Sequence, residues 1–185
     1  MKTRRIHILG ASGAGVTTLG LALASRLSIP HHDSDDYFWR PTNPPYRENR
    51  PAAESLQLME ALFLGRDQWV LSGSVVGWAE AVTQMFDFVV FLQAPTETRL
   101  QRLRERETRR FGIEAVVPGA WRHEETEEFL DWASHYDDGS REGRSLAKHE
   151  AWLKTLTCPL LRADGSRQTA DLVDEILGVL ADRGL

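Results

Sequence analysis

The sequence predicts an α/β domain with a mainly parallel sheet, on the basis of three observations. Short apolar runs alternate along the chain with longer segments of helical periodicity. The run from Phe88 to Leu92 is apolar at every position, which is typical of a strand buried on both faces. A glycine-rich turn joins the first apolar run to the first helical segment. Strands that alternate with helices form crossovers, which place helices on both faces of a parallel sheet.

The first half of the chain is expected to hold three strands, two helices and a long loop. Leu19, Leu23 and Leu27 form the apolar stripe of the first helix. Prolines and acidic residues interrupt the pattern after the second strand, and Gly65 ends the second helix. In chain order the elements are a strand at 6–9, a helix from 17, a strand at 29–33, a loop at 33–46, a helix at 52–64 and a strand at 69–72.

The second half is expected to hold two more strands and three helices. Pro95 ends the fourth strand, and Val173, Ile176 and Leu180 share one face of the last helix. A polar, acidic segment without regular apolar periodicity separates the arginine-rich helix from the next one. The elements are a strand at 86–92, a helix at 96–109, the polar segment at 111–145, a helix at 146–156, a strand at 159–162 and a helix from 166.

The composition fits one globular domain over 1–185. The chain has 185 residues, of which 42% are hydrophobic and 26% charged, so a largely disordered chain is excluded. Its net charge of −5 disfavours nonspecific binding to nucleic acid or anionic membranes. The chain has no apolar run long enough for a membrane span or a signal peptide, and its single cysteine, Cys158, is typical of a reducing compartment. We expect a cytoplasmic protein with neither nucleic-acid nor membrane partners; the sequence leaves its oligomeric state open.

The glycine-rich turn at 10–18 fits the phosphate-loop pattern G-x-x-x-x-G-K-[ST] at every fixed position except one. Val16 stands where the pattern has a phosphate-binding lysine. Glycines let backbone N–H groups turn toward a phosphate, and the following helix N-terminus adds a positive dipole end. Thr17 is placed to ligate Mg²⁺ through its hydroxyl. The predicted nucleotide-binding residues are Gly10, Ser12, Gly13, Ala14, Gly15, Val16, Thr17 and Thr18.

Two other interpretations of this turn are less favoured. The first is a strand-to-helix turn that binds no ligand. It is disfavoured because strand, glycine spacing, hydroxyl and helix all occur together here. A dinucleotide-binding turn finds the G-x-G spacing at Gly13 and Gly15 but has Thr18 in place of its third glycine.

Together these residues resemble the small P-loop kinases, which include adenylate-kinase-like, shikimate- and gluconate-kinase-like and nucleoside-kinase-like proteins. The Gly-Ala-Ser-Gly of the loop is similar to that of bacterial adenylate-kinase-like or topology-modulation proteins. The resemblance spans nearly the whole chain, although its specific motifs lie within residues 1–40 and the arginine-rich helix. It implies a three-layer fold with a five-stranded parallel sheet of order 2-3-1-4-5 and a mobile helical lid at about 111–145. It also implies transfer of the γ-phosphate of ATP, with Mg²⁺, to a small acceptor.

The acidic segment after the second strand resembles two substrate motifs of these kinases. Asp33 and Asp35 stand where shikimate- and gluconate-type kinases carry D-x-D, and 35–41 is similar to the D-D-F-Y-x-P segment of nucleoside-type kinases. The resemblance implies that Asp33, with Thr17, binds the metal and that Asp35 accepts a proton from the acceptor hydroxyl. A solvated acidic loop, or the N-cap of a short helix, is the alternative. A metal cluster with His31 and His32 is disfavoured, because no second cluster follows at ligand spacing.

Arginines recur every three or four residues after the fourth strand, at positions 99, 102, 106, 109 and 110. A helix would place several of them on one side, with Leu100 and Leu103 on the other, and a solvated face paired with glutamates is the alternative. The resemblance implies that one arginine near the end of this helix packs on the adenine and that others contact phosphates. Arg102 and Arg106 are the predicted catalytic arginines, Arg106 also binds the nucleotide, and Arg144 beyond the lid is a further candidate.

Two more segments bear on the acceptor. Ser72-Gly73-Ser74 stands where shikimate-type kinases have a substrate loop with three glycines, so shikimate itself is not favoured. Tyr37, Trp39 and Trp78 are candidates for an aromatic wall against a base or sugar, with ordinary packing as the alternative. The main hypothesis is an ATP-dependent kinase for a nucleoside, nucleotide or similar hydroxylated metabolite. The alternative, which Val16 keeps open, is a slow NTPase switch or a nucleotide sensor without acceptor phosphorylation.

Overall fold

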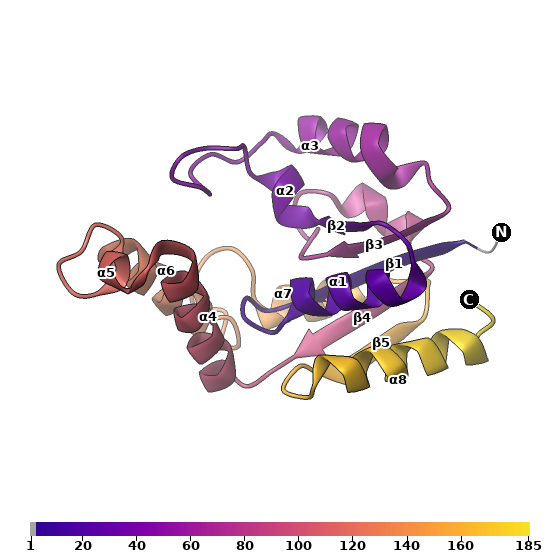
Figure 1. The fold of residues 1–185 in the computed structure, drawn as a ribbon. Coiled ribbons are helices and arrows are strands. Elements are labelled where there is room, and N and C mark those ends of the chain that lie inside the picture. The colour runs from indigo at the N-terminus through magenta and orange to yellow at the C-terminus, as the bar shows by residue number, and fades with distance from the viewer. Residues whose placement is uncertain (1–2) are drawn as a thin grey trace.

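The computed structural model, which describes residues 3–185, has a five-stranded parallel sheet between two layers of helices (Figure 1). The strand order is β2-β3-β1-β4-β5 and every neighbouring pair is parallel, so the predicted fold class and topology are confirmed. The strands are β1 (Arg4–Gly10), β2 (His31–Asp33), β3 (Gln68–Ser72), β4 (Phe88–Gln93) and β5 (Leu160–Asp164).

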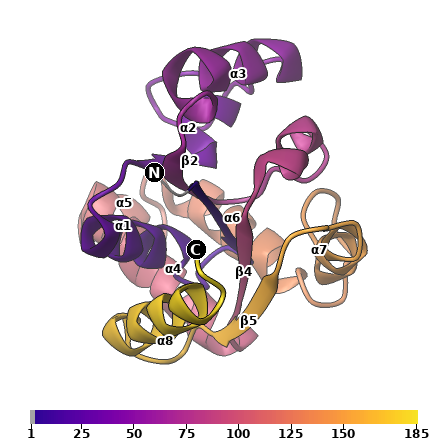
Figure 2. The same ribbon diagram turned by 90° about the vertical axis from the view of Figure 1, so that its right-hand side faces the viewer.

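Helices cover both faces of the sheet. Figure 2 shows α1 and α8 on one side of the strands, with α3 and α7 on the other. The helices are α1 (Val16–Leu27), α2 (Ser34–Phe38), α3 (Ala52–Met59), η1 (Glu60–Leu64), η2 (Glu80–Met85), α4 (Thr96–Phe111), α5 (Ile113–Val116), α6 (His123–Ser134), α7 (Leu146–Leu153) and α8 (Thr169–Asp182). No helix within residues 3–185 has the length and apolar character needed to cross a membrane.

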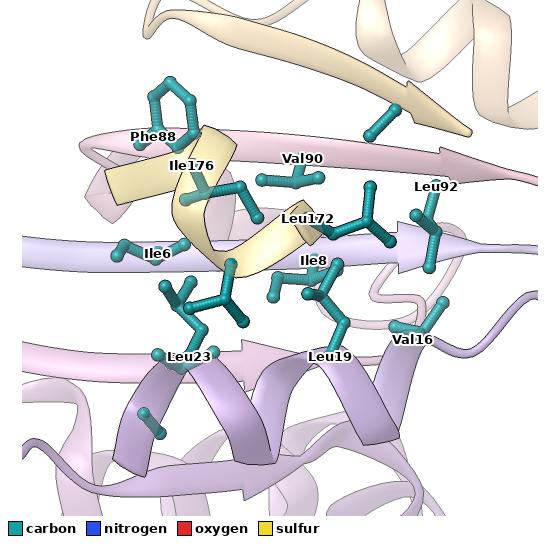
Figure 3. Close-up of a cluster of buried hydrophobic side chains, with 14 of the residues drawn as sticks. Ile6, Ile8, Val16, Leu19, Leu23, Phe88, Val90, Leu92, Leu172 and Ile176 are labelled. Carbon is teal, nitrogen blue, oxygen red and sulfur yellow. The ribbon is translucent and has the colours of Figure 1, made fainter. Parts of the chain in front are cut away.

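The alternation of side chains along the strands divides the core into two parts. Ile6 and Ile8 of β1 point to one face, where they meet Leu19 and Leu23 of α1 and Ile176 of α8 (Figure 3). Leu9 of β1 points to the opposite face, together with the alternate side chains of β3 and β4. There Trp69, Leu71 and Phe91 pack against α3, η1 and α7. The sheet is therefore buried on both faces, as the continuous apolar strands predict.

All the strands point the same way, so their carboxyl ends lie at one edge of the sheet. Ile8 is in register with Ser72 and Val90, and Asp33 is in register with Ser72. This brings the glycine-rich turn after β1, the acidic segment after β2 and the Ser-Gly-Ser turn after β3 together. In Figure 1 this edge faces α4, α5 and α6, while the chain ends lie at the opposite side. Ligands of open α/β sheets bind at this edge.

The elements differ from the sequence-based expectation mainly within the two polar segments. The expected loop at 33–46 begins with the short helix α2, and the turn after β3 leads into η2, which the sequence did not indicate. The expected helix at 52–64 continues from α3 into a π-helical turn. The predicted lid at 111–145 contains α5 and α6, and Leu130 and Ala133 of α6 pack on Leu103 of α4 in a small cluster of their own.

Candidate functional site

The turn between β1 and α1 has the backbone of an anion-binding loop. Gly13 and Gly15 have φ values of 82° and 100°, in a backbone region that residues other than glycine rarely adopt. The loop also packs tightly on α4, because a Cβ at Gly13 would lie only 2.5 Å from the carbonyl oxygen of Arg99. Gly15 caps α1, whose first N–H groups therefore face the turn. The turn thus presents backbone donors and a helix N-terminus to one point in space.

Val16, the first residue of α1, turns its side chain away from this point. It belongs to the buried core cluster with Leu92 and Leu172, as Figure 3 shows. Its Cγ2 would also lie 3.2 Å from a Cβ placed at Gly10. Position 16 therefore supplies packing and a backbone N–H to the loop, and no charge.

Thr17 and Asp33 meet directly beside the loop. The Thr17 hydroxyl donates to Asp33 Oδ2 at 2.8 Å, and the other carboxylate oxygen of Asp33 accepts the backbone N–H of Asp35 at 3.0 Å. Asp33 is therefore the N-cap of α2 as well as the partner of Thr17. A hydroxyl and a carboxylate at this distance are hard oxygen donors of the kind that Mg²⁺ prefers, so the pair fits such an ion.

Asp35 lies two residues further, within α2, and forms an ion pair with Arg144. The two side chains approach to 3.5 Å between Asp35 Oδ1 and the Arg144 guanidinium. Burial raises the pKa of Asp35, and the positive charge of Arg144 opposes that rise. Asp35 is therefore a carboxylate with raised basicity that faces the same opening as the loop, where Ser12 also lies.

The arginines of α4 divide into three environments. Arg99 is buried and ties α4 to the segment 111–145 through Asp137 at 2.8 Å and the carbonyl of Ala133 at 3.2 Å. It faces the packed side of α4 with Leu103, so the expectation that the arginines and leucines lie on opposite sides is wrong at this position. Its partners fix the guanidinium, so Arg99 has a structural role.

The two predicted functional arginines lie nearer to the loop and the opening. Arg102 donates to the carbonyl oxygen of Gly165 at 2.8 Å and approaches that of Ala14 at 3.4 Å, so it joins the loop to the turn after β5. Arg106 lines the large cleft described below, where it pairs with Glu107 at 3.2 Å and stacks on Phe129. The structure thus places Arg102 beside the loop and Arg106 at the cleft.

A cleft of about 1160 Å³ extends from Ser12 and Asp35 to α6. Trp39 and Trp78 line it, and Phe38 joins them between the two. Tyr37 does not: it is buried, its hydroxyl pairs with His32 Nδ1 at 2.7 Å and its ring packs on Phe63. The proposed membership of Tyr37 in the aromatic wall is therefore wrong, because α2 turns that residue into the core.

A buried polar network at the floor of the cleft was not found from the sequence. Both ring nitrogens of His149 form hydrogen bonds, Nδ1 with Tyr136 Oη at 2.7 Å and Nε2 with Ser74 Oγ at 3.1 Å. Burial lowers the pKa of His149 to about 4, so the ring is neutral. The three residues come from the turn after β3, the end of the lid and α7. No local motif joins them, so only the fold shows the network.

His31 and His32 do not form a metal cluster with the aspartates. His31 Nε2 pairs with Ser72 Oγ at 2.9 Å, and the ring of His32 stacks on Phe63 with 3.9 Å between centroids. Within residues 3–185, no group of three or more His, Cys, Asp or Glu side chains is arranged to hold a metal ion by itself.

Comparison with curated proteins identifies one relative along nearly the whole chain. The uncharacterized protein YqaC of Bacillus subtilis is 42% identical over 178 residues, which cover 96% of this chain and 98% of YqaC. A shikimate kinase of Enterococcus faecalis is 33% identical over 116 residues, which cover 54% of this chain and 65% of that enzyme. No family model matches the sequence.

Comparison with solved structures gives the fold. The shikimate kinase of Acinetobacter baumannii in complex with shikimate superposes with a TM-score of 0.58 at 19% identity, covering 99% of this chain and 96% of that one. A gluconokinase of Sinorhizobium meliloti superposes with a TM-score of 0.55 at 17% identity, covering 97% of this chain and 93% of that one. The chain therefore belongs to the family of Bacillus subtilis YqaC and has the α/β fold seen in small P-loop kinases.

Proposed function

We propose that the protein is an ATP-dependent kinase that transfers the γ-phosphate to a hydroxyl group of a small metabolite, with nucleosides and nucleotides among the candidate acceptors. One observation carries the proposal. The Thr17–Asp33 pair is hydrogen-bonded to the backbone of Asp35, and the carboxylate of Asp35 lines one cleft, large enough for a metabolite, together with Ser12 of the anion-binding loop.

In this proposal the loop binds the triphosphate through its backbone N–H groups and the N-terminus of α1. Thr17 and Asp33 hold Mg²⁺, which supplies positive charge beside the phosphates. Asp35 orients the acceptor hydroxyl and accepts its proton while the hydroxyl oxygen forms its bond to the γ-phosphorus and the bond to the β-phosphate oxygen breaks. Arg102, Arg106 and Arg144 lie around this point and compensate the negative charge.

Val16 favours a second candidate, in which the site binds or slowly hydrolyses the nucleotide without an acceptor. Single-turnover reactions with labelled ATP and a panel of hydroxylated metabolites separate the candidates. Label found in an acceptor supports the kinase, label released only as inorganic phosphate supports a switch, and bound but unconverted ATP supports a sensor. A protein that binds no nucleotide at millimolar ATP with Mg²⁺ contradicts all three.

Replacement of Val16 by lysine is expected to tighten ATP binding roughly tenfold, or about 1.4 kcal/mol. The lysine has to leave the core position of Val16 and turn toward the opening of the loop, where its ammonium group pairs with the β- and γ-phosphates. Val16→Met is the matched control, since it adds length without charge. Isothermal titration with a non-hydrolysable ATP analogue and Mg²⁺ measures both. If lysine weakens binding while methionine does not, a resident cation already fills that space, and Arg102 is the first to test.

The lid is expected to exchange its amide hydrogens quickly without ligand and more slowly with an ATP analogue and Mg²⁺. The effect should be largest over residues 113–122, where Ile113 and Trp121 are 59% and 65% exposed. Residues 123–134 should exchange more slowly, because α6 packs on α4 through Leu130. Hydrogen-exchange mass spectrometry gives both rates, with peptides from β1 as the internal reference. Strong protection of 113–122 in the free protein would contradict a mobile lid.

A further inference from the structure

The large cleft is unusually rich in aromatic side chains. Four of the six tryptophans of the chain line it, at positions 39, 78, 132 and 152. On one side three rings in mutual contact form a wall, in which Phe38 lies 4.8 Å from Trp39 and 5.3 Å from Trp78 between centroids, with the ring planes at 88° and 57°. Across the cleft, Phe129 and Trp132 of α6 stack at 6.0 Å. These five residues are half-buried, so part of each side chain is open to the cleft.

The indole N–H groups of three of these four tryptophans already have partners. The indole N–H of Trp78 donates to the carbonyl of Ser74 at 2.8 Å, and that of Trp132 donates to the carbonyl of Glu142 at 2.8 Å. The indole N–H of Trp152 donates to the Thr83 hydroxyl at 3.1 Å. These contacts hold the rings in place. What remains for contact with a ligand is their flat, weakly hydrated faces. A saturated polyol binds through many hydrogen bonds, whereas a planar ring binds by stacking on the face of an aromatic side chain.

The position of the wall links a bound ring to the reaction. Phe38 and Trp39 follow Asp35 by three and four residues and line the same cleft. A ring stacked on the wall would therefore carry its hydroxyl substituent next to the Asp35 carboxylate. Ser12 at the edge of the phosphate loop lines the same opening.

We propose that the acceptor is a hydroxylated small molecule with a planar, π-conjugated ring, which stacks on the wall formed by Phe38, Trp39 and Trp78. The inference rests on the proposed kinase function, because it names the class of acceptor for the same site. It separates this chain from kinases of saturated polyols that share the fold. Stacking of a base on an aromatic side chain is sequence-tolerant, so the wall accepts several kinds of ring.

Matched pairs of alcohols test this inference. The common nucleosides are compared with methyl riboside, and hydroxymethylpyridine is compared with cyclohexylmethanol, by titration in the presence of an ATP analogue and Mg²⁺. The ring-bearing member of at least one pair should bind about tenfold or more tightly than its partner, in line with the usual gain from one stacked base. Equal affinities within both pairs overturn the inference.

Variants locate the effect in the wall. Trp39→Leu should remove about tenfold of the affinity for the ring-bearing alcohol, and Trp39→Phe should retain most of it. Trp121→Leu is the control, because Trp121 is 65% exposed at the lid tip and does not line the cleft. A Trp39→Leu variant that binds the ring-bearing alcohol as well as the Trp121→Leu variant does would overturn the inference.

The same experiments keep the two proposals apart. ATP binding and the release or transfer of its phosphate are measured with every alcohol, whether or not it carries a ring. If ATP is turned over with a ring-free alcohol as the better acceptor, the kinase proposal stands and the ring inference fails. If a flat ring binds to the wall but no phosphate is transferred to any alcohol, the kinase proposal fails and the inference about its acceptor fails with it, while the wall remains a ring-binding surface.

Discussion

Asp35→Asn is expected to lower the rate of phosphoryl transfer by roughly 10²-fold or more, while ATP binds almost as tightly as in the parent protein. The amide has the size of the carboxylate but does not accept the proton of the acceptor hydroxyl. The link between Asp33 and α2 is kept, because it uses the backbone N–H of residue 35. The Thr17–Asp33 pair is therefore undisturbed, and the loss falls on the chemical step.

Single-turnover rates and equilibrium titrations separate these effects. Asp36→Asn is the control, since Asp36 lies on the same short helix but is exposed. An equal loss of ATP affinity in Asp35→Asn would reassign Asp35 to the metal, and unchanged turnover would remove it from the site. In the parent protein, turnover should fall as the pH decreases through the pKa of Asp35, which burial raises above its usual value.

The architecture was predictable because strand burial and helix periodicity are local properties of the sequence. The apolar run of β4 and the stripe of α1 need only neighbouring residues to be recognised. The order of the strands came from the resemblance of the turn at 10–18 and its surroundings to a known fold. The same turn led to the Thr17–Asp33 pair, which the register of β2 and β3 brings to the loop.

Side-chain direction within the polar segments was less predictable. In α2, Ser34 and Tyr37 are both buried, three residues apart, whereas Phe38 turns to the cleft. The spacing of Ser34 and Tyr37 is the signal that assigns Tyr37 to the core, and it is readable only once a helix is known to begin at Ser34, with Asp33 as its N-cap. The sequence offered that helix only as an alternative, because the composition of a short acidic segment with prolines nearby does not distinguish it from a loop.

Buried polar groups were the other exception. The packed stripe of α4 is Arg99, Leu103 and Glu107, of which two are charged. Burial of Arg99 depends on partners such as Asp137 and the carbonyl of Ala133, which lie 38 and 34 residues further along the chain. Sequence periodicity treats charged residues as exposed, so it has no means to find a charge whose partners come from distant segments.

The tight contact between the phosphate loop and α4 leads to the second large effect. Gly13→Ala is expected to weaken ATP binding by roughly 100-fold, or about 2.7 kcal/mol. The new methyl group would lie 2.5 Å from the Arg99 carbonyl oxygen, a backbone atom that has no rotamer by which to move away. The φ of 82° at this position adds strain for any residue with a Cβ. The loop must therefore change its path, and its N–H groups lose their common direction.

Gly119→Ala is a matched control for this experiment. Gly119 has a φ of 83°, and a Cβ placed there has no heavy atom within 4 Å, so alanine adds the backbone strain without the collision. Titration with an ATP analogue and circular dichroism melting are measured for both variants. If Gly13→Ala binds ATP as Gly119→Ala does, the close packing of the loop on Arg99 does not fix the phosphate site. A loss confined to Gly13→Ala means that α4 holds the loop in the conformation that binds the nucleotide.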